Sequence, residues 1–264
     1  MKACLLQKDQ ADKIKRGLAL YAEDVRKLVR MGKPFVLFSG GQDSLCLIDR
    51  INRVARVVTR NITVIHADTT AGLPEVEEYV HKTCNELGME LVVVRPDRDF
   101  FETAKKWGIP SPRSRWCCDT LKVRPIRRYL ESIEGPRVVF DGIRAAESTA
   151  RARYTPVWYH PAFKCLCVSP IFYWSNEKVR KYVRARNLPE SPVAKLGVSG
   201  ECWCGAYQTR KDFEALLSIH PGIYEKLVHV EKAQRGKYTF VFDAGKKVSL
   251  SKIRAEVIAS DDRK

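Results

Sequence analysis

The sequence predicts an α/β protein whose core is a parallel, twisted sheet flanked by helices, with a small C-terminal appendage. Three observations support this fold class. Short runs such as Phe35-Val36-Leu37-Phe38 are wholly apolar, which is typical of strands buried on both faces of a parallel sheet. Amphipathic segments alternate with these runs, and this rhythm favours right-handed crossovers. With 264 residues, the chain is long enough to bury a sizeable core.

The elements are expected in the following order. An amphipathic helix over residues 12–30, with apolar residues at every third or fourth position, ends at Gly32 and Pro34. Strands are expected at 35–38, 62–66, 91–94 and 138–140, and helices from Asp43-Ser44 onward and at 75–87, 121–133 and 176–186. Residues 107–119 are rich in Pro, Ser and Arg and are expected to form a long functional loop.

The alternation of strands and helices stops after a Pro-rich turn at 189–192. We therefore expect residues 1–190 to form a nucleotide-binding α/β domain with an N-terminal helix. Residues 191–264 are expected to form a C-terminal region that carries a Cys-x-Cys motif, a helix near 211–218 and a strand near 238–242.

The net charge is +16, from 47 Lys and Arg against 31 Asp and Glu. Such an excess attracts polyanions, so contact with DNA or RNA is one interpretation, and a surface of ion pairs with a basic bias is the other. No stretch approaches the ~20 apolar residues that span a bilayer. The charged N-terminus lacks an apolar signal core, and the nine cysteines favour a reducing compartment. A cytoplasmic protein without membrane contact is expected.

A phosphate-binding loop is predicted directly after the first strand. It consists of Ser39, Gly40, Gly41, Gln42, Asp43 and Ser44. The glycines allow a tight turn, and the first amides of the following helix attract phosphate together with the helix dipole. The two serines add hydroxyl donors. Asp43 cannot donate to a phosphate at neutral pH, so we expect it to hold Mg²⁺ or to cap the helix. A glycine turn without a ligand is the alternative.

Polar residues follow two other predicted strands. Asp68 follows the second strand, and because the carboxyl ends of neighbouring parallel strands face one crevice, we expect it near the loop. Its alternative role is a simple helix cap. Arg144 and Arg151 follow the strand at 138–140 and are suited to clamping phosphate or sulfate. A solvated helix face is the alternative for this pair.

Together these motifs resemble those of the PP-loop superfamily, whose loop reads Ser-Gly-Gly-x-Asp-Ser, and within it the phosphoadenosine phosphosulfate (PAPS) reductase family. The resemblance runs from about residue 35 to 210 and includes Cys117-Cys118-Asp119 and Ser169-Pro170-Ile171. It implies an adenine nucleotide alpha hydrolase-like fold and a site for ATP or an adenylyl-sulfate with Mg²⁺. The implied nucleotide contacts are the six loop residues, Asp68, Arg144 and Arg151, with Lys122 near the substrate. Asp43, Arg144 and Arg151 are the expected catalytic residues.

Four cysteines are candidate metal ligands: Cys117, Cys118, Cys202 and Cys204. In the adenylyl-sulfate (APS) reductase branch of the resembled family, a tandem pair and a later Cys-x-x-Cys hold a [4Fe–4S] cluster. The resemblance implies a cluster here, on all four thiolates or on three, because the second pair is one residue shorter. Zinc, or free buried or redox-active thiols, are the alternatives. Cys165 and Cys167 are spare candidates.

Two reactions fit these motifs. A reductase of the resembled family needs a thiol on a mobile tail, but no cysteine follows Cys204 in this sequence. The preferred interpretation is therefore an ATP pyrophosphatase that activates an acceptor by adenylylation for sulfur incorporation. The segment from Gly142 to Arg151 is similar to relatives that act in DNA phosphorothioation, and RNA thiolation is of the same type. Partners would be a nucleic acid and a sulfur-donor protein. An APS or PAPS reductase is the second interpretation, and a non-catalytic nucleotide sensor the third.

Overall fold

The computed structural model describes residues 22–58, 61–195, 202–243 and 245–261. The chain forms two compact units. The first comprises Met1–Ala67, Pro74–Val94 and Pro125–Pro192, and the second comprises Asp68–Leu73, Arg95–Arg124 and Val193–Lys264. No helix in these described ranges is both long enough and apolar enough to cross a membrane.

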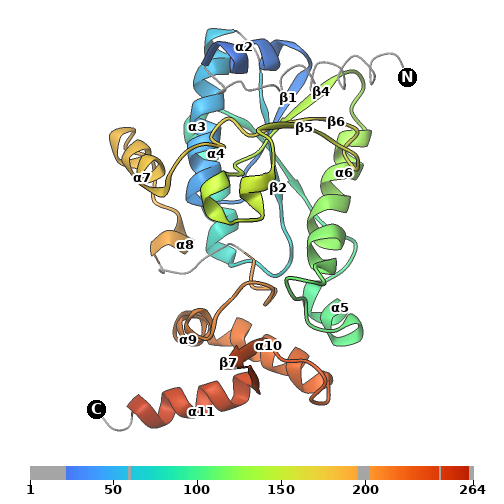
Figure 1. Ribbon diagram of the computed structural model, residues 1–264, viewed down its shortest axis with the longest axis vertical. Coiled ribbons are helices and arrows are strands. Elements are labelled where there is room, and N and C mark those ends of the chain that lie inside the picture. The colour runs from blue at the N-terminus through green and yellow to red at the C-terminus, as the bar shows by residue number, and fades with distance from the viewer. Residues whose placement is uncertain (1–21, 59–60, 196–201, 244, 262–264) are drawn as a thin grey trace. The chain divides into compact units, whose positions relative to one another are not determined.

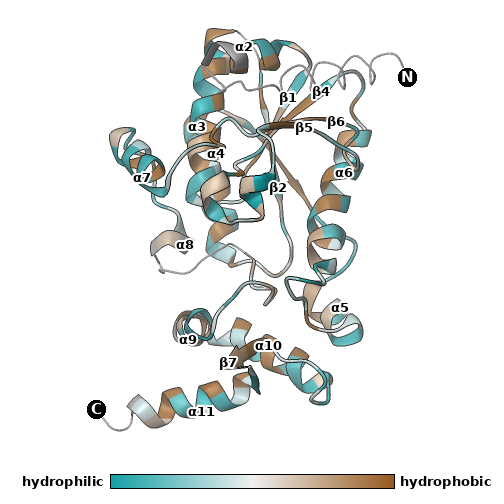
Figure 2. Ribbon diagram, in the orientation of Figure 1, coloured by the Kyte–Doolittle hydropathy of each residue, from teal (hydrophilic) through white to brown (hydrophobic). Residues whose placement is uncertain are grey.

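The first unit is built on a six-stranded sheet with the order β3-β2-β1-β4-β6-β5. The strands are β1 Lys33–Leu37, β2 Thr63–Ala67, β3 Glu90–Val94, β4 Arg137–Phe140, β5 Val157–His160 and β6 Cys165–Val168. All neighbours pair in parallel except the edge strand β5, which is antiparallel to β6. Figure 2 shows the central strands in the hydrophobic colour. Their apolar side chains are buried because helices cover both faces.

The helices of the first unit alternate with these strands. They are α2 Ala22–Arg30, α3 Gln42–Val57, α4 Pro74–Leu87, α6 Arg124–Glu131 and α7 Asn176–Ala185, followed by the short α8 Pro192–Lys195. In Figure 1, α3 and α4 cover one face of the sheet and α6 covers the other. The chain thus changes face between β1 and β4, which pair side by side. Such a switch point is where open α/β sheets place their ligand sites.

The second unit is mostly helical. It contains α5 Phe100–Trp107, a π-helical turn at Cys118–Val123, α9 Arg210–Ile219, α10 Pro221–Ala233, the hairpin strands β7 Val241–Asp243 and β8 Lys246–Val248, and α11 Leu250–Asp261. One buried carboxylate organises this region. Glu231 on α10 accepts hydrogen bonds from Thr239 at 2.6 Å and from the amides of Phe240 and Leu250 at 3.2 and 2.7 Å. These bonds tie both ends of the hairpin to α10.

The predicted fold class is confirmed, with a mostly parallel sheet flanked by helices. The four predicted strands correspond to β1 to β4 within two residues. The predicted helix at 121–133 divides into the π-helical turn and α6, and the helix expected at 12–30 is described from Ala22 onward, its earlier part lying outside the described residues. The expected loop at 107–119 is shorter, because α5 ends at Trp107 and the π-helical turn begins at Cys118.

Candidate functional site

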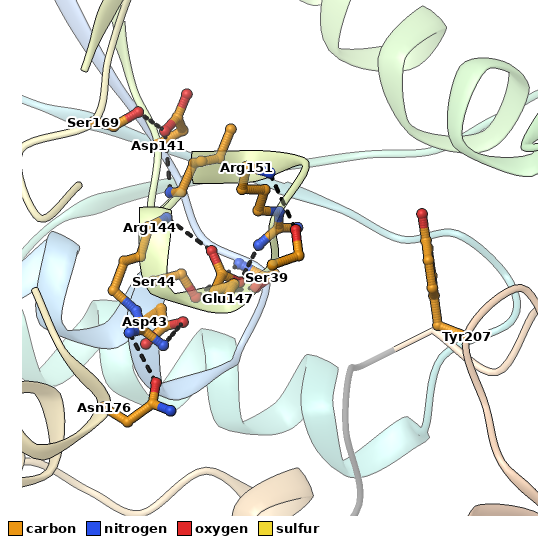
Figure 3. Close-up of polar contacts among 12 residues, drawn as sticks. Ser39, Asp43, Ser44, Asp141, Arg144, Glu147, Arg151, Ser169, Asn176 and Tyr207 are labelled. Carbon is orange, nitrogen blue, oxygen red and sulfur yellow. Dashed lines mark hydrogen bonds and ion pairs between the residues drawn. The ribbon is translucent and has the colours of Figure 1, made fainter. Parts of the chain in front are cut away.

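The predicted phosphate loop links β1 to α3 in the first unit (Figure 3). Gly40 has φ of +91°, a conformation that side-chain-bearing residues avoid, and Gly41 is the N-cap of α3. The Ser44 hydroxyl donates to the Gly41 carbonyl at 2.9 Å and accepts from the Ser39 amide at 3.3 Å. The loop is therefore a closed turn that opens onto the first turn of a 16-residue helix, where backbone amides lack helical partners.

The turn after β4 packs tightly on this loop. A Cβ added to Gly142 would lie 3.2 Å from the Ser44 amide nitrogen and 3.3 Å from the Asp43 carbonyl carbon. The atoms that this Cβ would meet belong to the backbone, so neither the turn nor the loop can move away easily. Gly142 thus allows the strand-end turn to lie directly beside the start of α3.

Arg144 is buried, with 6% of its surface exposed. Its Nη2 donates to Asp43 Oδ2 at 2.8 Å, and its Nη1 donates to the Trp174 carbonyl at 3.1 Å and to Asn176 Oδ1 at 3.0 Å (Figure 3). Among the described residues, its Nε has no partner. Arg144 therefore fixes the loop, and its predicted contact with a nucleotide phosphate, through Nε or the second N–H of Nη2, stays a prediction.

Asp43 is the second residue of α3 and does not cap the helix. The N-cap is Gly41, and no side chain caps it, so the expectation of a capping role for Asp43 is wrong. Burial raises the pKa of the Asp43 carboxyl, and the ion pair with Arg144 opposes this effect. The pair leaves Asp43 Oδ1 for another ligand, and a role in Mg²⁺ binding stays a prediction. Gln42, half-buried, is the first residue of the same helix.

Arg151 is the accessible member of the predicted arginine pair. Its side chain is 42% exposed and pairs with Glu147, which also accepts from the Arg144 amide at 2.8 Å. The two arginines lie beside short 3₁₀ turns at Ala145–Glu147 and Arg151–Arg153, not on one regular helix face. Contact between Arg151 and a phosphate stays a prediction.

Asp141, directly after β4, is a buried carboxylate that the motif analysis did not single out. Its Oδ1 accepts from the Ser169 hydroxyl at 2.5 Å and from the Ile143 amide at 3.2 Å. These bonds hold the turn that carries Gly142. Burial raises the pKa of Asp141 from 3.8 to about 6, although the bond from Ser169 opposes the shift.

Two other residues of the loop's surroundings were also missed. Asn176 contacts Arg144, and the Ser191 hydroxyl donates to the Gly40 carbonyl at 2.5 Å. Asp141 had a usable signal, since it directly follows a predicted strand and ligands of open α/β sheets bind at the carboxyl ends of the strands. Asn176 and Ser191 had none, because their partners are distant in the sequence.

Asp68 belongs to the second unit. Its Oδ1 accepts from the Thr70 amide at 2.8 Å, and its Oδ2 pairs with Arg95 at 3.1 Å. The segment it begins is joined to the later cysteine motif, because the Trp203 amide donates to the Ala71 carbonyl at 2.7 Å and Gly72 forms a β-bridge with Cys202. The predicted proximity of Asp68 to the phosphate loop stays a prediction.

The four candidate ligand cysteines come together within the second unit. Hydrogen bonds between thiols join Cys118 to Cys117, Cys117 to Cys204 and Cys204 to Cys202. We call these four residues the cysteine group. The bond to Cys118 raises the pKa of Cys117 to about 12, whereas that bond and the charge of Lys122 lower the pKa of Cys118 to about 7. Lys122 thus lies near the cysteine group, and its predicted role toward a substrate stays a prediction.

The donor set of the cysteine group suits a thiophilic centre. In the described part of the chain, no three His, Cys, Asp or Glu side chains are already arranged as ligands of one metal ion. Four neighbouring thiols nevertheless match the donors that iron–sulfur clusters and zinc take. The buried indole N–H of Trp203 lacks a hydrogen-bond partner among the described residues, as fits a site completed by a bound acceptor.

The remaining described cysteines are core residues. Cys46 on α3 and Cys84 on α4 are fully buried, as expected, and Cys4 lies outside the described residues. Cys165 and Cys167, the spare candidates, lie on the buried strand β6 in the first unit. They therefore do not join the cysteine group.

A doubly wound sheet with a Ser-Gly-Gly-x-Asp-Ser loop at its switch point defines a PP-loop protein of the adenine nucleotide alpha hydrolase-like class. Within that class, residues 33–221 match the phosphoadenosine phosphosulfate reductase domain, and the chain belongs to this family. The predicted family is thereby confirmed.

Relatives by sequence include proteins of two kinds. The uncharacterized protein MJ0066 of Methanocaldococcus jannaschii is 29% identical over 214 residues, 79% of this chain and 44% of that protein. The adenosine 5′-phosphosulfate reductase of Lysinibacillus sphaericus is 25% identical over 162 residues, 60% of this chain and 66% of that enzyme. The chain thus spans less than half the length of the first relative.

Solved structures share the fold. The PAPS reductase of Candida auris, solved as a phosphate complex, superposes with a TM-score of 0.56 at 20% identity, covering 74% of this chain and 95% of that chain. The FMN adenylyltransferase of Candida glabrata, solved with FAD and pyrophosphate, gives a TM-score of 0.50 at 12% identity, covering 75% of this chain and 71% of that chain.

The raised pKa of Asp141 predicts a specific pH dependence of stability. Because the folded state holds the Asp141 proton more tightly than the unfolded state, this residue stabilises the fold fully below about pH 4, and the contribution is lost as the pH rises through about 6. Urea unfolding of the wild type and of Asp141→Asn at pH 4, 5, 6 and 7 should show the wild type losing up to about 3 kcal/mol relative to the variant. A constant difference across this range would contradict the assignment.

Proposed function

We propose that the protein is an ATP pyrophosphatase that adenylylates an acceptor and so prepares it for sulfur incorporation. An oxygen of the acceptor attacks the α-phosphorus of ATP, the bond to the bridging oxygen of pyrophosphate breaks, and pyrophosphate leaves. A sulfur nucleophile then displaces AMP from the activated acceptor.

The burial of the cysteine thiols favours this reaction over reduction of an adenylyl-sulfate. Reduction of an adenylyl-sulfate needs a thiolate that reaches the sulfate sulfur and is released afterwards. Every cysteine in the described ranges is buried or half-buried. The two half-buried ones, Cys118 and Cys202, belong to the cysteine group. These facts favour chemistry at the phosphate over chemistry at sulfur by a protein thiol.

The first unit supplies the groups for phosphate chemistry. The amides at the start of α3 would bind the phosphates, and so would the hydroxyls of Ser39 and Ser44 once Ser44 exchanges the Gly41 carbonyl for a phosphate oxygen. The exposed guanidinium of Arg151 would stabilise charge on the α-phosphate, while Arg144 holds the loop in shape. Mg²⁺ bound with the nucleotide and Asp43 would neutralise the charge that develops on pyrophosphate.

The acceptor we propose is a nucleic acid, as in DNA phosphorothioation or RNA thiolation. The net charge of +16 supports a polyanionic partner. A sulfur-donor protein completes the proposed reaction. The cysteine group is proposed to hold a [4Fe–4S] cluster on four thiolates or on three. With three, the cluster would supply an iron at which sulfur binds or is delivered.

APS or PAPS reduction is the second candidate. It is favoured by the relative that is named an adenosine 5′-phosphosulfate reductase, and by the half-buried Cys118, whose thiolate the charge of Lys122 favours. In that reaction a cysteine would attack the sulfate sulfur and release AMP or adenosine 3′,5′-bisphosphate.

The products formed by anaerobically purified protein decide between these reactions. We expect pyrophosphate from ATP, stimulated by nucleic acid and less so as salt is added, because basic contacts to phosphates release counterions. We expect no thioredoxin-dependent sulfite from APS or PAPS. Sulfite formation that is lost in Cys118→Ser, Cys165→Ser, Cys167→Ser or Cys202→Ser would reverse the choice.

Substitutions in the loop should remove this activity. Ser44→Ala should do so without unfolding the protein, whereas Asp43→Asn also leaves the buried charge of Arg144 without its carboxylate partner and should lower stability. Ser44→Ala and Asp43→Asn are expected to lower pyrophosphate release about a hundredfold, the usual cost of losing one preorganised group at developing charge. Ser132→Ala, at the exposed end of α6, is the matched control and should leave the rate unchanged. Wild-type ATP affinity and rate in Ser44→Ala, with unchanged circular dichroism, would argue against the loop.

The cysteine group should hold iron. Protein purified without oxygen is expected to be brown and to contain about four irons per chain. Cys117→Ser and Cys202→Ser should bleach it, whereas Cys84→Ala, in the buried face of α4, should retain the iron. Iron and zinc analysis provides the measurement, and stoichiometric zinc without iron would contradict the cluster.

A further inference from the structure

Helix α7 is attached to the first unit by one narrow face. Val179 is buried in a cluster with Cys46, Ile171 and Trp174, against which Tyr182 and Val183 also pack. The Tyr182 hydroxyl donates to Asp49 on α3 at 2.6 Å, and Arg186, just beyond the helix, pairs with the same carboxylate at 3.1 Å. These contacts fully account for the inward face of α7.

The outward face of α7 is basic and has no structural task. It exposes Lys178, Arg180, Lys181 and Arg184. Lys181 pairs with Glu177 at 2.7 Å, and Lys178 lies 4.9 Å from the centre of the Trp174 ring. In the part of the chain that the structure describes, the guanidinium groups of Arg180 and Arg184 make no hydrogen bond or ion pair. They lie one helical turn apart, about 6 Å along the axis.

This face begins at the phosphate loop. Asn176, the first residue of α7, binds Arg144, which binds Asp43 at the start of α3. Farther along, Tyr182 and Arg186 bind Asp49 on α3, so contacts with α3 continue along α7. The exposed Tyr173, 65% accessible, lies three residues before this helix, at the end nearest the loop.

We propose that the outward face of α7 binds the phosphate backbone of nucleic acid and leads the strand toward the phosphate loop. Cations without internal partners, arranged along a helix, are what a polyphosphate strand recognises, and an exposed aromatic ring offers a platform for a base. The inference deepens the proposed function, on which it rests for the reaction of the acceptor. Binding itself is measured without ATP.

The test compares binding of labelled single-stranded RNA, single-stranded DNA and duplex DNA by fluorescence anisotropy over a range of salt concentrations. The doubly neutralised variant Arg180→Gln/Arg184→Gln should bind at least about tenfold more weakly, and the slope of log affinity against log salt should fall by about 2. The matched control is Arg26→Gln/Arg30→Gln, a pair of exposed arginines with the same spacing on α2, which should bind like the wild type.

Several outcomes overturn the inference. They are absence of binding by the wild type at low salt, equal losses in the two variants, and equal binding of polyglutamate in place of nucleic acid. Failure of the proposed function looks different. If the wild type and control bind nucleic acid but release no pyrophosphate from ATP, the proposed binding surface is supported and the proposed reaction is contradicted. If the α7 variant keeps basal pyrophosphate release and loses only its stimulation by nucleic acid, the binding surface and the reaction are both supported.

Discussion

The guanidinium of Arg144 joins three segments that are far apart in the sequence. It is carried by the turn after β4, it pairs with Asp43 in the phosphate loop, and it binds Trp174 and Asn176 at the start of α7. A buried charge is costly unless it is paired and hydrogen-bonded, so these segments are stable together only while the pair is intact. The shape of the loop therefore depends on β4 and α7 as much as on its own glycines. An arginine that appeared from its motif to be a phosphate ligand is first of all the residue that builds the site.

The sheet order sets up this arrangement. Because β1 pairs with β4, the loop after β1 and the turn after β4 leave the same edge side by side. Gly142 allows the backbones to touch, and Asp141 holds the turn by accepting bonds from Ser169 and Ile143. The site is thus made of backbone held by buried polar side chains, and the amides at the start of α3 and the partly exposed Arg151 are the groups proposed to meet a ligand.

The fold and the loop were predictable because their signals are local. An apolar run, two glycines and a helix start lie within a few residues of each other, and the structure forms them as β1, the loop and α3. Helix α5, the strands β5 and β6 and the helix α10 were not predicted. The two strands have only four residues each, too few for a clear period. The hydrogen-bond partners of Arg144 could not be predicted from the sequence for another reason. Asp43 and Asn176 are separated from it by 101 and 32 residues, and no local pattern encodes such a pairing.

The chemistry of the chain is divided between its two units. The loop, Asp141, Arg144 and Arg151 belong to the first unit, and the cysteine group, Lys122 and Asp68 belong to the second. Each set is joined by contacts within its own unit: the first through the Arg144 network, the second through thiol hydrogen bonds and the backbone bond from Trp203 to Ala71. The residues proposed for phosphate chemistry and the cysteine group are therefore held by separate hydrogen-bond networks. In the proposed reaction, the residues of the first network would activate the acceptor at phosphorus, and the cysteine group would serve the later arrival of sulfur.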